Sequence, residues 1–383
     1  MKTLLLLTGI GCAAIPDSLH ISAHLDSLLR GKYLDMHCHA AGIGAGGSGC
    51  FLSHDIRSSF KYSLYLKAFG VTEEELKASG DTLVVSLIAA KLDSSQSVGA
   101  AVLLAMDGVI GPDGKLDTNR TQIFVPDSFV VRETRRYPRL LYGASINPAR
   151  PDAISLLEKA KANGAVLLKW IPSIQLIDPG DSALIPFYLA MKRLGLPLLS
   201  HTGKESSFKT ARNELGDPQR LRLPLKLGVT VIAAHVATRG RNEGEDNMER
   251  LCSMFTEYPN LYADISSLTQ INKMGLLDKV LARPEVKGRL LYGTDYPLIQ
   301  TALVSPYYFA FSQSLKKIRE VDRIANPWDQ DVALKKLLGV SEEVFQLPVK
   351  LLLAKGEETK GKLKSGKKLR PQKKKKKVRQ PSF

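Results

Sequence analysis

Two histidines one residue apart, His37 and His39, lie in an apolar stretch near the start of the chain. Alternate residues of a β-strand point to the same side, so a strand over 34–40 would aim both imidazoles at one side. Met36 and Cys38 would then face the other side. Paired imidazoles at this spacing are typical of a metal clamp, and the plainer interpretation is two core histidines with satisfied hydrogen bonds.

Four further polar residues end apolar runs, where parallel strands would end. They are Lys169, His201, His235 and Asp295. Consecutive members of this set are 32, 34 and 60 residues apart, and one strand–helix repeat takes about 30 residues or more. The spacing therefore corresponds to one, one and two repeats. A (β/α)8 barrel collects its strand ends on one face, so we expect the site there.

Predicted strands and helices alternate along the chain. We expect strands at 34–40, 100–107, 140–147, 166–170, 196–201, 229–235, 260–265 and 290–295. Helical periodicity covers 59–69, 72–78, 82–91, 151–163, 182–194, 245–257 and 273–282. The first three helices form an insertion that would roof the site, and the turn-rich 108–127 predicts a long loop. This regular alternation predicts an α/β fold, a closed TIM-type barrel, for which 383 residues suffice.

Five of the polar residues sit in short motifs. These are His37-x-His39, His201 in Ser-His-Thr-Gly, His235 in Ala-Ala-His, and Asp295 in Gly-Thr-Asp-Tyr-Pro. In this order they resemble the metal-dependent amidohydrolase superfamily, in particular its branch related to aminocarboxymuconate-semialdehyde decarboxylase and lactone hydrolases. The resemblance covers about 32–347. It implies a distorted barrel that binds a divalent metal, with zinc the preferred ion and one or two ions bound.

The resemblance also implies roles for these residues. It implies that the metal is held by His37, His39, His201 and Asp295. Asp295 would also be the base for the bound water, and His235 would be a second metal ligand or the polarising residue. Lys169 stands where binuclear members carry a carboxylated lysine that bridges two metals, whereas mononuclear members lack it or leave it unmodified. The number of metal ions therefore stays open.

The chemistry of these side chains fits such a site independently. Zinc takes imidazole and carboxylate ligands and keeps an open position for a water, whose pKa falls to about 7. Asp295 could accept that proton, and the plainer interpretation is a helix N-cap near Pro297. A buried lysine without a partner is costly, so Lys169 would need carboxylation, an anionic partner or a substrate carboxylate. For Asp107 and Asp264 we favour structural roles.

Basic residues follow several strand ends, among them Lys204, Arg239 and Arg241. A single one would be a solvated loop charge. Several beside a cationic metal would attract an anion, and an arginine can grip a carboxylate with two hydrogen bonds. Together with Trp170 they predict a pocket for a small substrate that carries a carboxylate. We expect hydrolysis of an amide, ester or lactone; the alternative is nonoxidative decarboxylation, for which only His235 offers a carbon-directed acid.

A glycine-rich stretch, Gly42-x-Gly44-x-x-Gly47, follows the first strand and has the form of a dinucleotide-binding fingerprint. No strand ending in an acidic residue follows about 20 residues later, which such a site requires. We favour a flexible loop that lets backbone or substrate approach the metal. His54, just beyond it, is expected on the surface.

The C-terminal 355–383 differs in charge from the rest of the chain. The whole chain carries a formal charge of +16, and this segment has 13 Lys or Arg against two Glu, hence +11. The remaining +5, which is 16 less 11, does not indicate a nucleic-acid surface on the body. We expect a disordered Lys-rich tail, with nucleic acid or an anionic surface as its alternative partner and a binding function as the second alternative to catalysis.

The N-terminal 1–31 has a positive start, a short apolar run and small residues around Cys12. This pattern is typical of an export signal and resembles the start of a bacterial lipoprotein, although Gly9 stands where that pattern usually has Leu. We expect export or membrane anchoring through Cys12; the alternative is a packed N-terminal arm on a cytoplasmic protein. One catalytic domain would then span 32–354. Four cysteines without CxxC spacing indicate neither a structural zinc site nor a disulfide framework.

Overall fold

The computed structural model of the protein describes residues 29–352. The predictions of an export signal or arm, of lipidation at Cys12 and of a Lys-rich tail fall outside the described residues and stay predictions. Among the helices of 29–352, none combines the length and apolar character that crossing a bilayer requires.

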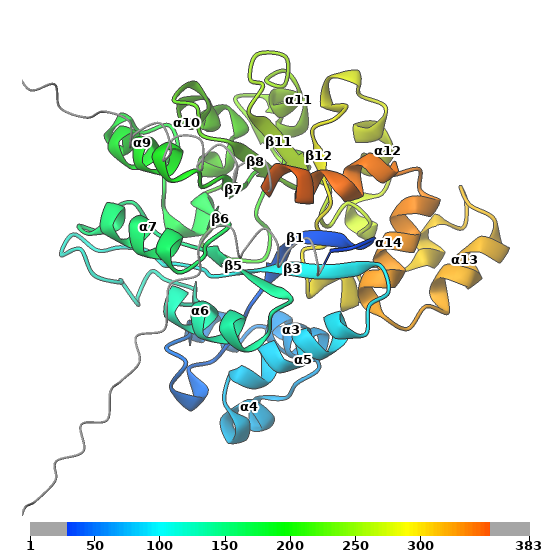
Figure 1. The fold of residues 1–383 in the computed structure, drawn as a ribbon, viewed down its shortest axis with the longest axis horizontal. Helices are drawn as coiled ribbons and strands as arrows, with labels where there is room; N and C mark the ends of the chain where they lie inside the picture. Colours follow the sequence, from blue (N-terminus) through cyan, green and yellow to red (C-terminus); the bar gives the residue numbers. More distant parts are fainter. Residues whose placement is uncertain (1–28, 353–383) are drawn as a thin grey trace, which may run out of the picture.

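The central feature is one sheet of parallel strands, in the order β1-β3-β5-β6-β7-β8-β11-β12 (Figure 1). Its strands are β1 Tyr33–His39, β3 Val98–Leu104, β5 Leu140–Ala144, β6 Leu167–Trp170, β7 Leu198–His201, β8 Val231–Ala234, β11 Leu261–Asp264 and β12 Leu290–Leu291. They are buried almost throughout and rich in Val, Leu, Ile and Ala, as strands covered on both faces must be. Each of them overlaps a predicted strand.

The first and last strands meet and close the sheet. The amide of Met36 donates to the carbonyl of Tyr292 at 3.3 Å, and that of His39 donates to the carbonyl of Tyr296 at 3.0 Å. Cys38 and Tyr296 form a parallel bridge at the same seam. The prediction of a closed (β/α)8 barrel is therefore confirmed.

Helices surround the barrel and alternate with its strands (Figure 1). They are α2 His54–Arg57, α3 Phe60–Phe69, α4 Glu73–Ser79, α5 Thr82–Asp93, α6 Asp127–Arg136, α7 Ala153–Ala162, α8 Pro172–Gln175, α9 Ile185–Leu194, α10 Arg222–Lys226, α11 Asn247–Cys252, α12 Leu276–Leu281, α13 Leu315–Asp322 and α14 Pro327–Leu337. Two short antiparallel pairs join β2 Phe51–Leu52 to β4 Ile123–Phe124, and β9 Arg241–Asn242 to β10 Glu245–Asp246.

Local capping explains several helix boundaries. Thr72 and Glu75 form a reciprocal capping box at the start of α4, and Gly70 ends α3 in the left-handed conformation. The helix predicted over 245–257 begins two residues later, as α11, because Glu245 and Asp246 pair in a hairpin. Asp246 then caps α11 by accepting a hydrogen bond from the amide of Met248.

The insertion between β1 and β3 reaches across the mouth of the barrel. From α3, Lys61 donates to the carbonyl of Ser206 at 2.7 Å, and Tyr65 donates to the hydroxyl of Ser207 at 3.1 Å. Ser206 and Ser207 belong to the loop that follows β7, on the other side of the barrel from β1. These contacts agree with the prediction that the insertion covers the site.

The first strand departs from simple alternation. Met36 packs with Leu34 in the cluster inside the barrel, whereas Cys38 packs in the cluster between barrel and helices. The pairing register between β1 and β3 shifts between Asp35 and Cys38. This bulge-like irregularity lets Met36 fill the barrel interior while His37 faces the mouth. The prediction that Met36 and Cys38 share a side is therefore wrong.

Candidate metal centre

The strand ends bring six of the predicted site residues to one mouth of the barrel. These are His37 and His39 on β1, Lys169 on β6, His201 on β7, His235 just after β8, and Asp295 after β12. Parallel strands place their carboxyl ends on the same face, so residues far apart in the chain become neighbours.

The side chains of this group converge on Asp295. Its Oδ1 lies 3.2 Å from Nε2 of His39 and 3.6 Å from Nε2 of His37, and its Oδ2 lies 3.9 Å from Nε2 of His235. One ligand atom from each of His37, His235 and Asp295 lies within 4.8 Å of the other two. All three residues are buried. Nitrogen and oxygen donors gathered in this way are the donor set that a zinc-type ion prefers.

A carboxylate behind the group orients two of the histidines. Asp264, at the end of β11, accepts from Nδ1 of His37 at 2.9 Å and from the backbone amide of His235 at 3.0 Å. Burial alone would raise the pKa of Asp264, but the imidazoles of His37 and His235 hold it well below its usual range. The ionised carboxylate fixes the His37 tautomer, so that the lone pair is on Nε2, which faces the mouth. The structural role expected for Asp264 thus becomes one of positioning.

Burial favours the neutral form of His37, His201 and His235, which is the form that binds a metal. Burial, helped by the charge of Lys169, lowers the pKa of His37 to about 4, and burial lowers that of His201 to about 4. Burial also lowers the pKa of His235. Burial by itself would raise the pKa of Asp295. The neighbouring His235, His39 and His37 outweigh burial and keep this pKa below the usual range.

Two imidazole nitrogens at the mouth have no hydrogen-bond partner among the residues of 29–352. They are Nε2 of His201 and Nδ1 of His39. Glu205, which the sequence analysis missed, approaches Nε2 of His201 only to 3.6 Å. A buried polar atom without a partner costs about 1–3 kcal/mol. A metal ion at the mouth would satisfy Nε2 of His201, so the residues present fit such an ion.

Lys169 is fully buried beside the histidines. Its Nζ lies 2.9 Å from Nε2 of His37. Burial lowers the pKa of Lys169 to about 8, against the opposing charges of Asp264, Asp295 and Glu205. The bare amine would therefore compete with a metal ion for the lone pair on Nε2 of His37, whereas a carboxylated lysine would offer oxygen ligands instead.

Another lysine, Lys273, approaches from the loop after β11 and was not found from the sequence. Its Nζ donates to the hydroxyl of Ser267 at 2.6 Å, and that hydroxyl lies 3.1 Å from Nδ1 of His235. The hydroxyl of Ser266 lies 2.8 Å from the same nitrogen. These groups support His235 from the side that faces away from Asp295. The sequence signal for this support was Asp264 at a strand end, with serines at 266 and 267.

The backbone at the mouth is strained. His235, Val236 and Ala237 all have positive φ, at 59°, 51° and 49°, and Asp295 has φ 62°. Left-handed backbone is uncommon for residues other than glycine and is an outlier for a β-branched valine. Such strain clusters at functional sites, where the surrounding structure holds it. The turns after β8 and β12 thus direct His235 and Asp295 toward the mouth.

Comparison with known families decides the class of this barrel. The amidohydrolase family model matches residues 34–314. The chain belongs to the amidohydrolase family. Membership indicates an enzyme that acts on a small molecule, and the match includes every residue of the mouth described above. The family predicted from the motifs is confirmed.

Solved structures support the amidohydrolase barrel at the level of the fold. An uncharacterised TIM-barrel protein from Bordetella bronchiseptica is 15% identical, with a TM-score of 0.53, covering 85% of this chain and 99% of that chain. A probable 2-pyrone-4,6-dicarboxylic acid hydrolase from Acinetobacter baumannii, solved with citric acid bound, is 14% identical, with a TM-score of 0.52, covering 84% and 99%. No curated protein matches the chain.

The prediction that Trp170 binds substrate is wrong. Its indole is fully buried, donates to the carbonyl of Ile146 at 2.8 Å and stacks on Phe187 of α9, with ring centroids 5.6 Å apart. Adjacent residues of a strand face opposite sides. Because Lys169 faces the interior of the amidohydrolase barrel, Trp170 must face the helices.

The predicted basic residues divide between two places. Lys204 and Arg239 lie side by side, since the amide of Lys204 donates to the carbonyl of Arg239 at 3.0 Å. Arg241 is exposed and its guanidinium donates to the carbonyl of Gly244 in its own hairpin. This contact does not fit the predicted role of Arg241 in the substrate pocket.

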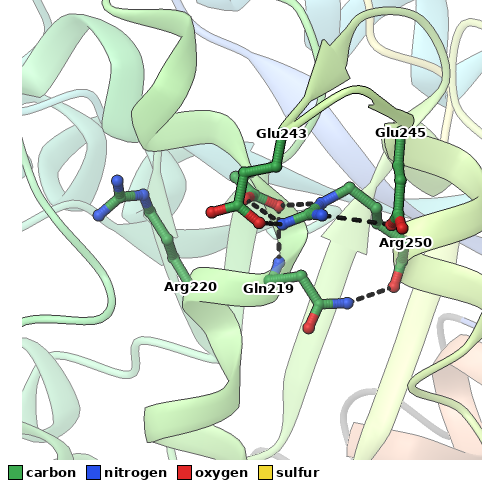
Figure 2. Close-up of a pocket in the computed structure, with 6 residues that line it drawn as sticks. Gln219, Arg220, Glu243, Glu245 and Arg250 are labelled. Atoms are coloured by element: carbon green, nitrogen blue, oxygen red, sulfur yellow. Dashed lines mark hydrogen bonds and ion pairs between the residues drawn. The ribbon is translucent and has the colours of Figure 1, made fainter.

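The same hairpin carries acidic residues on the rim. Figure 2 shows Glu243 and Glu245 directed at Arg250, with Gln219 below them. These residues line a hollow of about 420 Å³. Arg250 is buried and also pairs with Asp217 at 2.8 Å. Three carboxylates around the Arg250 guanidinium therefore surround this hollow with acidic groups.

Two further sequence features have structural roles. Asp107 pairs with the guanidinium of Arg150 through two hydrogen bonds of 2.6 and 2.7 Å, in line with the role we favoured. The glycine-rich loop wraps around Asp81, whose carboxylate accepts from the amides of Ile43 and Gly44 at 2.9 and 2.8 Å. Those amides are therefore taken and do not offer a dinucleotide site, and the loop is more constrained than expected. His54 is exposed at the start of α2, as expected.

Proposed function

We propose that this chain is a metal-dependent hydrolase of a small, carboxylate-bearing amide, ester or lactone. The observation that carries the proposal is the buried convergence of His37, His235 and Asp295 within 4.8 Å at the mouth of an amidohydrolase barrel. Nε2 of His201 also supports it, because this buried atom has no hydrogen-bond partner among residues 29–352 and a metal ion would supply one.

The residues that would hold a divalent ion are the ones at the mouth. They are His37, His39, His201, His235 and Asp295, with Lys169 added if carboxylation converts it to an oxygen ligand. When bound, zinc would supply Lewis acidity, polarising a substrate carbonyl and lowering the pKa of water to about 7. Whether one or two ions bind depends on the chemical state of Lys169.

Asp295 would act as the general base. Its carboxylate is ionised near pH 7, because the neighbouring imidazoles keep its pKa below the usual range against the effect of burial. It can therefore accept a proton from a water that attacks the substrate, and it can return the proton to the leaving group. His235, whose Nε2 lies 3.9 Å from Asp295, would polarise the substrate carbonyl in the alternative in which it does not hold the ion.

Basic side chains would hold the substrate carboxylate. Lys204 and Arg239 lie together on the rim. A carboxylate pairs with such groups by charge-assisted hydrogen bonds. The carboxylate would thereby fix which end of the substrate approaches Asp295.

The test is a substrate screen with metal-depleted and metal-restored protein. The panel would hold lactones, amides and esters with and without a carboxylate, and 2-pyrone-4,6-dicarboxylate is included because the similar protein from Acinetobacter baumannii is named for it. Oxygen from labelled water should appear in the product. Release of carbon dioxide without that incorporation would instead establish nonoxidative decarboxylation, and full turnover without metal would refute metal dependence.

A further inference from the structure

A second hollow lies on the outside of the barrel, away from the metal centre. It has a volume of about 500 Å³ and is bounded by α6, α7 and the end of β5. Its lining includes Asp127, Tyr142 and Ser145 on one side and Arg135 and Lys159 on another. No role in the proposed hydrolysis uses these side chains.

We call this hollow the α6–α7 cavity. Its inner end offers a carboxyl group, that of Asp127. Oδ1 of Asp127 accepts from the hydroxyl of Tyr142 at 2.6 Å and from the amide of Ser145 at 3.0 Å. Oδ2 of Asp127 makes no hydrogen bond to any residue in 29–352. Burial raises the pKa of Asp127 to about 7, so near neutral pH this oxygen can meet either a donor or an acceptor.

Two cations line the cavity from facing helices. Arg135 is exposed on α6 and donates to the side chain of Asn163 at 3.0 Å, and Lys159 is exposed on α7. Neither forms an ion pair with a carboxylate in the part of the chain that the structure describes. Arg150, also at the cavity, is already neutralised by Asp107 at 2.6 Å. The unbalanced charge at the cavity is therefore positive.

The surface between these polar groups is apolar. Val131 of α6, Leu156 of α7 and Ile146 after β5 line it. An apolar ligand body would release water from these side chains at about 25 cal/mol per Å² buried. The cavity thus combines a hydrogen-bonding end, apolar walls and two free cations.

We propose that the α6–α7 cavity binds a small amphipathic anion, namely an aryl carboxylate that carries a hydroxyl group at the end remote from its carboxylate. The hydroxyl meets Oδ2 of Asp127, the ring packs between Val131 and Leu156, and the carboxylate pairs with Arg135 and Lys159. Charge-assisted pairing with two cations gives the carboxylate end its selectivity. The site is separate from the metal centre, because the backbone of β5 and β6 lies between them and the hydroxyl of Ser145 donates to the carbonyl of Lys169 at 2.8 Å.

The test measures binding of 4-hydroxybenzoate to the full chain by titration calorimetry and ligand-observed NMR. The double variant Arg135→Glu, Lys159→Glu should weaken binding at least about tenfold, because both charge-assisted contacts become repulsive. Both side chains are exposed, so the fold should be unaffected, and equal melting temperatures would verify this. The neutral analogue 4-hydroxybenzamide should bind the unaltered chain at least about tenfold more weakly.

A matched control has the same change in charge elsewhere. Lys316 and Arg319 are exposed on α13, and the variant Lys316→Glu, Arg319→Glu should bind 4-hydroxybenzoate as the unaltered chain does. Lys204→Ala, at the mouth of the barrel, should also leave binding unchanged. Equal weakening in the two double variants would show general charge attraction and overturn the proposal. Binding that is lost in Lys204→Ala and kept in Arg135→Glu, Lys159→Glu would place the anion at the metal centre and also overturn it.

Discussion

Two buried polar clusters lie next to each other in this barrel and differ in how completely their hydrogen bonds are made. The first, which we call the seam cluster, consists of Asp35, Thr294 and Trp328 at the junction of the first and last strands. Asp35 accepts four hydrogen bonds there: from the amides of His37 and Thr294 at 3.0 Å each, from the hydroxyl of Thr294 at 2.6 Å and from the indole of Trp328 at 2.9 Å. At the metal centre, Nε2 of His201 and Nδ1 of His39 have no partner among residues 29–352. The satisfied cluster builds the scaffold, and the buried nitrogens without partners mark the other cluster as the candidate functional site.

The two clusters share backbone. Asp35 is two residues from His37, and Thr294 precedes Asp295, so the seam cluster fixes both segments that carry proposed ligands. Trp328 lies on α14, beyond the matched residues 34–314 of the family. Helix α14 therefore contributes to positioning the candidate metal centre without touching it.

The largest effect is expected from removing the proposed base. Asp295→Asn should lower kcat/KM by roughly 10³-fold, since general base catalysis contributes 10²–10⁴-fold. Steady-state kinetics on a substrate found in the screen would measure it. Asp107→Asn, at another strand end, should retain most of the activity. A variant of Asp295 with normal kcat/KM would remove the functional distinction between the two clusters.

A smaller effect is expected one step behind the ligands. Asp264→Asn should reduce metal affinity by about 10–100-fold, because it no longer fixes the His37 tautomer as a charged acceptor. Competition with a chromophoric chelator measures this affinity. Unchanged affinity would mean that Asp264 has only a structural role, as predicted from the sequence.

The rim should respond more weakly still. Lys204→Ala is expected to raise KM for a carboxylate-bearing substrate about tenfold with little change in kcat, because the contact serves substrate and transition state alike. Arg241→Ala is the control, since its guanidinium is held by its own hairpin. Equal effects of the two substitutions would show that the rim acts only through its overall charge.

The smallest effect on the metal centre is expected from the seam cluster. Trp328→Phe removes one of four donors to Asp35 and should lower the free energy of unfolding by about 1–3 kcal/mol. Metal affinity should stay within a few fold of the original. Trp170→Phe removes a comparable buried hydrogen bond at β6, away from the seam, and serves as the control. If Trp328→Phe alone lowered metal affinity as strongly as Asp264→Asn, the seam cluster would be part of the site rather than its scaffold.

Much of the barrel could be predicted because its determinants are local. Runs of branched apolar residues ending in a polar side chain define each parallel strand and its carboxyl end, so Lys169, His201, His235 and Asp295 were placed at one face from spacing alone. Helix α6 was not predicted, because the turn-rich stretch 108–127 directly before it indicated a long loop in that region. The boundary of α11 was misplaced because a hairpin competes with its first turn.

The side-chain environment of the site could be predicted only in part, because it depends on contacts between distant segments. Trp170 was assigned to the pocket since a strand end was assumed to aim every residue there, whereas alternation sends it to the helices. Glu205 lies in a loop whose course has no periodic signal. Lys273 was placed at the start of a helix predicted over 273–282, whereas that helix begins at Leu276 and leaves Lys273 in the preceding turn. The left-handed turn at His235 and Val236 is stabilised by tertiary packing against the preference of the residues themselves.

The seam between the first and last strands also bears on how the protein is made. Asp35 and Thr294 meet although they are 259 positions apart in the chain. During synthesis the N-terminal histidines emerge early, yet the strand that completes their surroundings leaves the ribosome only near the end. Contacts of such long sequence separation slow folding and leave the early strands without their final neighbour. The emerging β1 edge is therefore the segment of this barrel that most needs protection from premature association before β12 arrives.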